Sequence, residues 1–499
     1  MATTIQNSGA VRTPERPSVT ARLDGSQVRG AKWSEIAVTV GVSTFLHAIV
    51  LFLCAMIVFD NRQLEEIFTT IASINEVEQE PITESSLIQP EEIIQTNVDP
   101  NQGESNALDV ADVPVDMPNI NDLDPSMVLD SVEADSGLSV KIGDAMAGRS
   151  SAVKSQLLKE QGGNDASEAA VLTGLKWLAN HQADDGSWNF NHVGTKGCDC
   201  SQPGTLKACK TGATAMAMLA YMGGGHTHKK GDYQKEMKQA VDFMIKSQKV
   251  TPEGGDFRGI VSSNEGFYTQ GLVTIALCEA LALTKDERLR TPAFNAVKFI
   301  VNAQNPKDGG WRYQPRQAGD TSVVGWQVMA LKSAQMSKIK VPPQTFRGAE
   351  KFLDACAKNG GSQYTYVPGT GDAKNSMTAA GLLCRIYMGW EPNKPALKEG
   401  VAHLDKAKPA KGDMYYNYYA TQVMHHWGGP EWQRWNAVMR DQLIKTQLKQ
   451  GHATGSWNVA DPHGGSGGRL YMTCLAVMTL EVYYRHLPIY QRENVKVDF

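Results

Sequence analysis

Apolar residues recur at helical spacing through the last two thirds of the chain, and each apolar run ends in a Gly-rich turn with an aromatic residue. Residues 296–332 show the pattern in full: the run AVKFIVNAQ, a Gly-Gly-Trp turn, an Asp-Thr-Ser step and a second apolar run with small residues on one face. Side chains spaced by three and four positions share one helical face, so this stretch predicts a helical hairpin.

The hairpin is repeated about six times at a period of roughly 50 residues, which indicates a repeat architecture. The clearest first helices begin at Ala170, Ala240, Ala296 and Ala349, and weaker copies begin near Gly400 and Asn436. The second helices carry fewer charges and begin near Thr211, Thr269, Thr321, Thr378, Thr421 and Thr473. Helices that are apolar nearly all round are buried. We therefore expect residues 165–499 to form an all-α closed α/α toroid with the second helices inside, and an open solenoid is the alternative.

Residues 36–59 contain no formal charge and are numerous enough to span a bilayer as a helix. Five basic residues precede this stretch, whereas Asp60, Glu65 and Glu66 follow it with only Arg62 against them. Because positive charge stays on the cytoplasmic side, residues 1–35 are predicted to be a cytoplasmic tail. The large C-terminal part is then expected in the periplasm, held by a single-pass inner-membrane anchor.

Charge is distributed unevenly along the chain. Residues 63–140 contain 18 Asp and Glu and no Lys or Arg, and residues 141–499 contain 43 Lys and Arg against 31 Asp and Glu. Low hydrophobicity with charge of one sign is typical of disordered spacers, so residues 60–164 are predicted to be an acidic tether. The basic body favours anionic partners such as lipid headgroups, or is only a solvated surface.

Ser43 and His47 lie four residues apart in the predicted span, on one helical face. A Ser-x-x-x-His pair in a single N-terminal anchor, followed by an acidic Pro-containing stretch, resembles TonB-like energy-transducing proteins. The resemblance implies coupling to a proton-driven membrane motor complex. Alternatively, His47 only packs against a partner helix.

The segments QADDGSW, ending in Trp188, and QNPKDGGW, ending in Trp311, resemble the Gln-Trp repeats of squalene and other terpenoid cyclases and of protein prenyltransferase β subunits. Those proteins have the α/α toroid fold. The closing GGRLYMTCLAVMTLEVYYRHLP resembles the last repeat of membrane-anchored bacterial members of this superfamily, of the planctomycete type. The resemblance implies an isoprenoid or other apolar ligand. We expect the repeated Gln and Trp to be structural, with the Gln amide satisfying backbone groups at helix ends.

Both catalytic motifs of these families are incomplete in this chain. Where the cyclases carry Asp-x-Asp-Asp-Thr, Gln317 and Gly319 replace the first two acids, and only Asp320 and Thr321 match. Where the prenyltransferases hold zinc with Asp, Cys and His, Ser322 and Met472 replace the Cys and the His. The family zinc site is therefore not expected.

Asp320 is the candidate catalytic acid, because it is the only carboxylate just before an aligned second-helix Thr. Its alternative role is to cap the helix. An expected cavity wall, suited to a polyisoprenoid or a carbocation, consists of Tyr268, Trp326, Tyr415, Tyr419, His425 and Tyr471.

Cys198, Cys200 and Cys209 form a cluster near His226 and His228 in the sequence. A disulfide is the favoured interpretation outside the cytoplasm, and a metal site is the alternative. No phosphate-binding Gly-rich loop or nucleic-acid module is recognisable, so no nucleotide cofactor and no nucleic acid are expected.

Two functions follow from the sequence. The first is an enzyme or binding protein for an isoprenoid-like ligand, with a terpenoid cyclase-like reaction at Asp320 as the enzymatic form. The second is a non-catalytic envelope scaffold coupled to a membrane motor through Ser43 and His47.

Overall fold

The computed structural model describes residues 146, 148–149, 151–206, 208–259, 264–461, 464–487 and 489–490. The predicted cytoplasmic tail, the predicted span with Ser43 and His47, and most of the predicted tether lie outside the described residues. Among the described residues, only α6 (Gly266–Thr284) is long and apolar enough to cross a membrane, and it is mostly buried inside the protein.

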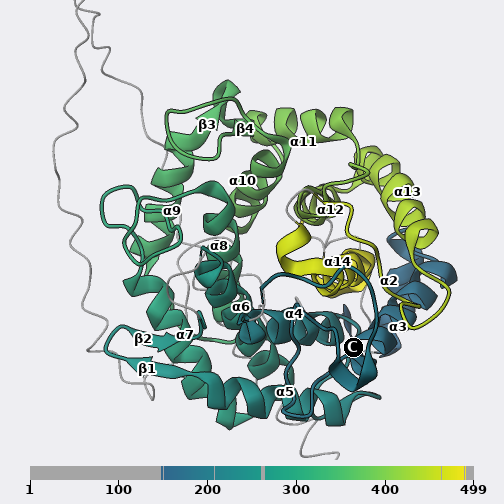
Figure 1. Ribbon diagram of the computed structural model, residues 1–499. Helices are drawn as coiled ribbons and strands as arrows, with labels where there is room; N and C mark the ends of the chain where they lie inside the picture. Colours follow the sequence, from purple (N-terminus) through teal and green to yellow (C-terminus); the bar gives the residue numbers. More distant parts are fainter. Residues whose placement is uncertain are drawn as a thin grey trace, which may run out of the picture. The chain divides into compact units, whose positions relative to one another are not determined.

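In the described part of the chain, helices pair into six hairpins that form two concentric rings (Figure 1). The inner ring consists of α4 (Lys210–Gly223), α6, α8 (Thr321–Met336), α10 (Asn375–Tyr387), α12 (Met414–Trp427) and α14 (Gly464–Leu480). The outer ring consists of α3 (Asp165–Asn180), α5 (Gln234–Ser247), α7 (Arg290–Asn302), α9 (Pro343–Cys356), α11 (Pro395–Ala407) and α13 (Gly429–Thr446). Each inner helix contacts the next, and α14 contacts α4. The ring is therefore closed, which confirms the α/α toroid over the open solenoid.

The two rings differ in burial as their composition predicts. On the inner helix α4, every residue from Thr211 to Gly223 is buried. On the outer helix α5, the buried residues are Met237, Ala240, Val241 and Met244, which are spaced by three and four positions. Such a stripe packs against the inner ring while the opposite face stays in water.

Short elements occupy the turns of the hairpins. Strands β1 (Lys249–Thr251) and β2 (Gly254–Asp256) pair antiparallel between α5 and α6, with Val250 opposite Gly255. Strands β3 (Ala357–Lys358) and β4 (Gln363–Tyr364) pair antiparallel between α9 and α10. Short 3-10 helices lie at Thr195–Gly197, Glu287–Leu289 and Asn359–Gly361.

The repeated Gln residues fasten neighbouring hairpins to one another. The Gln304 amide donates to Gly309 O in its own turn at 2.7 Å and to Thr345 O at the start of the next outer helix at 2.9 Å. Gln182 and Gln447 make the same pair of contacts in their repeats. Carbonyl groups at a turn and at a helix end are thereby satisfied, which confirms the expected structural role.

The repeated Trp residues close the end of the preceding outer helix. The indole nitrogen of Trp311 donates to Ile300 O at 2.8 Å, and the ring is fully buried. Trp188 and Trp457 make the equivalent bond to the last turns of α3 and α13. Each ring is therefore held by a backbone carbonyl of its own repeat, and the ring of Trp457 also lies against Gly174 of the first hairpin.

The structured part of the chain begins earlier than the expected boundary at residue 165. Helix α2 (Ser151–Glu160) lies within the predicted tether and buries Leu157 and Leu158. The turn after it is fixed by α13, since Trp432 Nε1 donates to Gln161 O at 3.0 Å. These contacts are made with a helix some 270 positions further along the chain. Local composition therefore could not show them.

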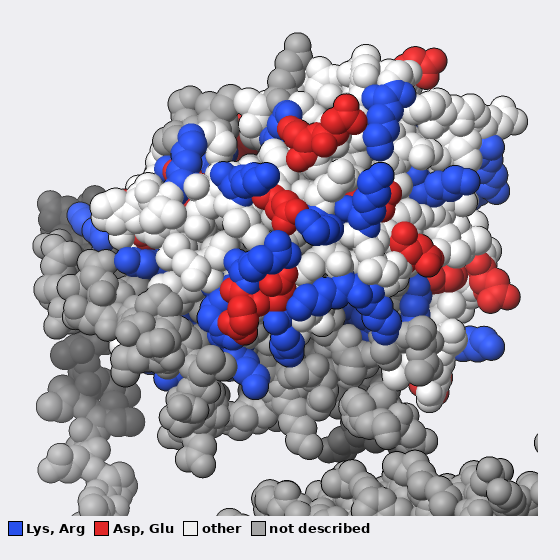
Figure 2. Space-filling view, turned by 90° about the horizontal axis from the view of Figure 1, so that it is seen from below, with Lys and Arg blue, Asp and Glu red and all other residues white. Residues whose placement is uncertain are grey.

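Charged groups of both signs are mixed on the surface. Figure 2 shows one face on which Lys and Arg lie among Asp and Glu instead of forming a field of one sign. Exposed ion pairs such as Lys238 with Asp242 and Arg290 with Glu287 illustrate this mixing. On this face, the charge distribution resembles an ordinary solvated surface.

Candidate functional site

Asp320 lies fully buried at the N-terminal end of α8. Its Oδ1 accepts hydrogen bonds from the backbone N–H of Val323 at 2.9 Å and from Ser322 Oγ at 2.6 Å. Its Oδ2 accepts from the Tyr366 hydroxyl at 3.1 Å and lies 3.5 Å from Arg312 Nε. The side chain therefore caps α8 and also joins a polar network on the other side.

Opposing effects act on the acidity of Asp320. Burial raises the pKa of this carboxyl above its ordinary value, because water no longer solvates the charge. The hydrogen bonds from Ser322, Val323 and Tyr366, and the charge of Arg312, act in the opposite direction without cancelling the effect of burial. The result is a carboxyl that holds a proton more readily than an exposed aspartate.

Five partly exposed tyrosines lie around Asp320 and the adjoining ends of the inner helices, and we call this group the tyrosine mouth: Tyr268, Tyr313, Tyr366, Tyr415 and Tyr471. Tyr268 and Tyr415 belong to the first turns of α6 and α12, and Tyr471 follows a kink at Gly468 in α14. These tyrosines keep accessible surface although most of the side chains after them on the inner helices are buried. They therefore face the space at this end of the ring.

The hydroxyl groups of the tyrosine mouth are largely engaged with the protein. Tyr268 donates to Ser322 Oγ at 2.7 Å, since Ser322 itself donates to Asp320. Tyr415 donates to Ser322 O at 3.2 Å, and Tyr313 donates to Tyr366. What these residues leave to a ligand is mainly the carbon surface of their rings.

The other residues expected in the cavity wall lie deeper and are buried. Trp326 stacks on Tyr418 with ring centroids 5.7 Å apart and meets Tyr419 edge-on at 5.5 Å. His425 is fully buried against Trp432, and neither of its ring nitrogens has a hydrogen-bond partner within the described residues. These three expected site residues therefore pack inside the ring, away from the tyrosine mouth.

A buried ion network fills part of the ring near the C-terminal ends of its helices. Glu279 of α6 pairs with Arg149 at 2.7 Å and with Arg485 of α15 (Val482–Arg485) at 3.4 Å, and Arg485 also pairs with Glu481 at 3.2 Å. Burial raises the pKa of Glu481 to about 8, whereas the two arginines outweigh burial and lower the pKa of Glu279. This network was not predicted from the sequence, although Glu279 is the only charged residue of α6.

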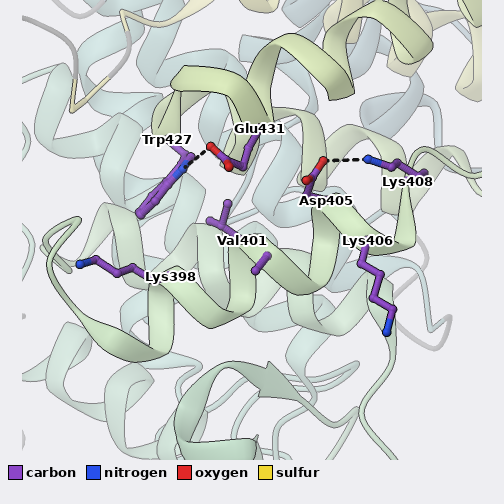
Figure 3. A pocket seen from close by; sticks show the side chains of 8 residues that line it. Lys398, Val401, Asp405, Lys406, Lys408, Trp427 and Glu431 are labelled. Atoms are coloured by element: carbon purple, nitrogen blue, oxygen red, sulfur yellow. Dashed lines mark hydrogen bonds and ion pairs between the residues drawn. The ribbon is translucent and has the colours of Figure 1, made fainter.

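A separate pocket lies on the outside of the ring between α11 and α13 (Figure 3). It encloses about 210 Å³, and both of its carboxylates are paired: Asp405 with Lys408 at 2.9 Å, and Glu431 with Arg434 at 3.2 Å. Ligand pockets usually enclose about 300 to 1,000 Å³. The lining residues are Lys398, Val401, Ala402, Asp405, Lys406, Lys408, Trp427 and Glu431. We do not place the functional site there.

The cysteine cluster has different partners from those expected. Cys198, Cys200 and Cys209 are buried, and no disulfide joins any two of the three. Cys198 and Cys200 face His181 and His452, and Cys209 lies outside this group at the start of α4.

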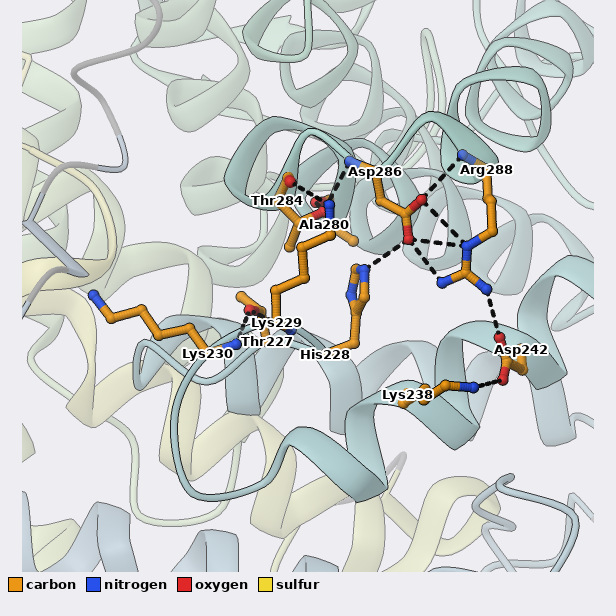
Figure 4. A network of polar contacts seen from close by, with 10 residues as sticks. All are labelled: Thr227, His228, Lys229, Lys230, Lys238, Asp242, Ala280, Thr284, Asp286 and Arg288. Atoms are coloured by element: carbon orange, nitrogen blue, oxygen red, sulfur yellow. Dashed lines mark hydrogen bonds and ion pairs between the residues drawn. The ribbon is translucent and has the colours of Figure 1, made fainter.

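The two histidines expected beside the cysteines serve other contacts. His228 Nε2 lies 2.9 Å from Asp286, which also binds Arg288, and Arg288 reaches Asp242 (Figure 4). His226 Nδ1 accepts from the backbone N–H of Asp232 at 3.2 Å. Both histidines therefore stabilise loops at the opposite end of their hairpin.

The fold is an all-helical α/α toroid, and the tyrosine mouth lies at one end of its inner ring. No family model and no curated protein matches the chain. Three similar solved structures are an α-1,6-mannanase of Salegentibacter sp. HEL1_6 (10% identity, TM-score 0.45), a novel α-amylase from Clostridium perfringens (10%, 0.43) and a variant of the type II terpene cyclase MstE from Scytonema with its substrate (11%, 0.44). They cover 63–64% of this chain and 97–99% of their own. Such low values carry no conclusion about activity.

Proposed function

We propose that the tyrosine mouth binds an isoprenoid-like ligand, with the polar end of the ligand at Arg312. The observation that carries the proposal is that the tyrosine hydroxyls already form hydrogen bonds with other groups of the protein. A tyrosine whose hydroxyl is already bonded presents mainly ring carbon, and ring carbon is buried favourably by an apolar chain. The sequence resemblance supports the same class of ligand.

Arg312 supplies the polar part of this site. Its guanidinium carbon lies 5.1 Å from the Tyr313 ring centroid and 5.5 Å from that of Tyr366, and its side chain is 30% exposed. Stacking on two rings fixes the orientation of the guanidinium, while Asp320 compensates part of its charge. The exposed N–H groups suit a hydroxyl, carboxylate or phosphate at the end of the ligand.

A proton-transfer reaction at the same site is the second candidate. It is favoured by the raised pKa of Asp320 and by the hydrogen bond from Tyr366, whose ring lies at the entrance. A buried carboxyl whose pKa is raised can serve as a general acid when it is protonated. With Asp320 protonated at Oδ2, the hydrogen bond with Tyr366 is reversed: Tyr366 gives its own hydroxyl proton to the ligand and receives the proton of Asp320 in its place, so Asp320 need not touch the ligand. The predicted membrane anchor would place either function at the periplasmic face of the inner membrane.

The test is mass spectrometry of molecules that co-purify with the full chain after exposure to membranes. We expect an isoprenoid lipid in the wild type and a retained amount that falls about tenfold or more in Arg312→Gln, since charge-assisted hydrogen bonds contribute about 1.5–3 kcal/mol. The control is Arg316→Gln, an exposed arginine on the same loop. Equal retention by both variants, or retention of an oligosaccharide instead of a lipid, would refute the proposal.

Asp320→Asn separates binding from reaction, because the two side chains have nearly the same shape. If Asp320 donates a proton, the variant keeps the bound lipid and loses its conversion. If Asp320 only positions Tyr366 and Arg312, the variant loses binding to an extent similar to Arg312→Gln. Circular dichroism and the urea midpoint show whether the variant remains folded.

A further inference from the structure

Four potential metal ligands converge where the first hairpin meets the last. His181 directly follows α3, Cys198 and Cys200 lie in the loop before α4, and His452 lies in the loop before α14. His181, Cys198 and Cys200 are buried, and His452 is exposed. Helices α3 and α13 are in contact and lie side by side in Figure 1. The four side chains therefore bridge the seam of the ring.

The distances between these ligand atoms suit a tetrahedral ion. His181 Nε2 lies 3.1 Å from Cys198 Sγ and 3.7 Å from Cys200 Sγ, and Cys200 Sγ lies 3.2 Å from His452 Nδ1. All four ligand atoms lie within 4.8 Å of one another. Zinc bonds of about 2.3 Å to sulfur and about 2.0–2.1 Å to nitrogen place tetrahedral ligands about 3.3–3.8 Å apart. Little movement is needed to reach that geometry.

The surrounding protein prepares His181 and Cys198 as ligands. His181 Nδ1 donates to Trp177 O at 2.6 Å, so the proton sits on Nδ1 and the Nε2 lone pair faces the sulfur atoms. The backbone N–H of Cys200 donates to Cys198 Sγ at 3.3 Å, which stabilises a thiolate. Metal-binding histidines and thiolates are commonly oriented by such contacts. These contacts therefore orient the ligand atoms of His181 and Cys198 and do more than pack the side chains in the core.

A fifth donor lies beside the group. His192 is fully buried, its Nδ1 lies 3.5 Å from Cys198 Sγ, and its Nε2 has no hydrogen-bond partner within the described residues. Burying an imidazole without a partner costs free energy. Thiols and neutral imidazoles offer each other only weak hydrogen bonds, so packing alone gives little reason to gather them. A metal ion between these side chains would give their sulfur and nitrogen atoms a strong binding partner.

We propose that His181, Cys198, Cys200 and His452 bind one zinc ion that fastens the first hairpin to the last. Two thiolates and two imidazoles in tetrahedral array favour zinc over hard, oxygen-seeking cations. The two thiolates neutralise the charge of the ion, which suits a buried position. Because the protein supplies all four ligands, the site is structural and leaves no position for a substrate.

The proposed ion joins two segments that lie far apart in the sequence. Cys200 and His452 are 252 positions apart, and closing so long a loop costs conformational entropy. Arg469 of α14 holds the same loop from the other side, with Nε donating to Ser201 O at 2.9 Å and its backbone N–H donating to Gln202 O. Removal of the ion is therefore expected to loosen the cysteine loop and the His452 loop together.

The experiment measures metal in the full chain, purified with a tag that does not bind metal. Elemental analysis is expected to give one zinc ion per chain, and Cys198→Ser and His452→Ala are each expected to reduce zinc retention on dialysis against a chelator at least tenfold. His452 is exposed, so its replacement leaves the core intact even if Cys198→Ser fails to fold. Replacing zinc with cobalt is expected to give the visible absorption of a tetrahedral, thiolate-ligated ion.

Two controls are matched to these variants. Cys209→Ser removes a buried cysteine of the same loop region outside the group, and Lys449→Ala changes an exposed residue of the His452 loop. Both are expected to retain zinc like the wild type. Hydrogen exchange after chelation is expected to rise at residues 192–206 and 448–457. Folded wild type without bound zinc, or equal zinc retention in His452→Ala and Lys449→Ala, would overturn the proposal.

Discussion

Replacing Gln304 with Ala tests how the hairpins are joined. The amide of Gln304 donates to Gly309 O at 2.7 Å and to Thr345 O at 2.9 Å, and the side chain is 3% exposed. Each lost hydrogen bond costs about 1 kcal/mol net, and a buried acceptor left unpaired costs about 1–3 kcal/mol. Carbonyls have a second lone pair for other partners, so the lower end applies. We expect Gln304→Ala to lower the free energy of unfolding by about 2–4 kcal/mol.

The assay is urea unfolding followed by tryptophan fluorescence, because Trp311 lies fully buried in the same repeat. Gln304→Glu is expected to lose more than Gln304→Ala, since a carboxylate cannot donate and would face two carbonyl oxygens. The control is Gln450→Ala at an exposed position, where a change within about 0.5 kcal/mol is expected. A loss below about 0.5 kcal/mol in Gln304→Ala would show that the repeated Gln is dispensable for joining hairpins.

Two further perturbations test other parts of the ring. Asp286→Asn is expected to lower the urea midpoint at pH 7, because the hydrogen bonds from Arg288 hold the pKa of Asp286 below its ordinary value. A depressed pKa stabilises the fold fully above the unfolded-state pKa of about 3.9 and progressively less below it, so the difference from wild type should persist at pH 5 and shrink only as pH falls below about 4; a difference unaffected by pH in that range would contradict this. Gly309→Ala is expected to cost more than about 2 kcal/mol, since φ is +78° and a Cβ would lie 2.1 Å from Gly348 O. Gly360→Ala, with φ +66° and no atom within 4 Å of its Cβ, should cost only about 1–2 kcal/mol, and equal losses in the two variants would refute the close approach.

The toroid could be predicted from sequence because its signals are local and repeated. An apolar stripe, a Gln and a Gly-Trp turn specify one hairpin within about 20 residues, as residues 296–311 show. Repetition then places each hairpin against the next. The start of the ordered body could not be predicted in this way, because α2 is held by contacts with α13 and α15, which come much later in the chain.

The site was only partly predictable for a similar reason. Asp320 stood out because no other repeat carries an acid at that position, and Tyr268, Tyr415 and Tyr471 are indeed at the same end of the ring. Trp326, Tyr419 and His425 follow in the same helices but lie deeper. Their depth follows from helix rise, since four residues advance about 6 Å along the axis. A sequence pattern predicts which face of a helix a residue lies on more readily than how deep in the ring it lies.

The cysteine cluster shows how proximity in sequence can mislead. His226 and His228 are close to Cys209 in the chain, but the 14 residues of α4 lie between them. At 1.5 Å per residue, that helix is about 21 Å long and carries the histidines to the other end of the hairpin. His452 lies far away in sequence, yet the closed ring brings it beside Cys200 at 3.2 Å. Only the closure of the toroid reveals the ligand set.

A closed ring of repeats has one junction that chain connectivity does not supply. Five of the six contacts between neighbouring hairpins join segments that follow one another in sequence, whereas the sixth joins the first hairpin to the last. Bonds of several kinds collect at that seam: the Gln447 amide donates to Ala170 O at 2.7 Å, and Arg469 binds the loop of the cysteines. Because ordering both ends of a long chain costs more entropy than ordering neighbours, the seam needs stronger contacts than the other junctions. A zinc ion there would meet that need, and the tyrosine mouth would keep its shape because the first and last inner helices could not separate.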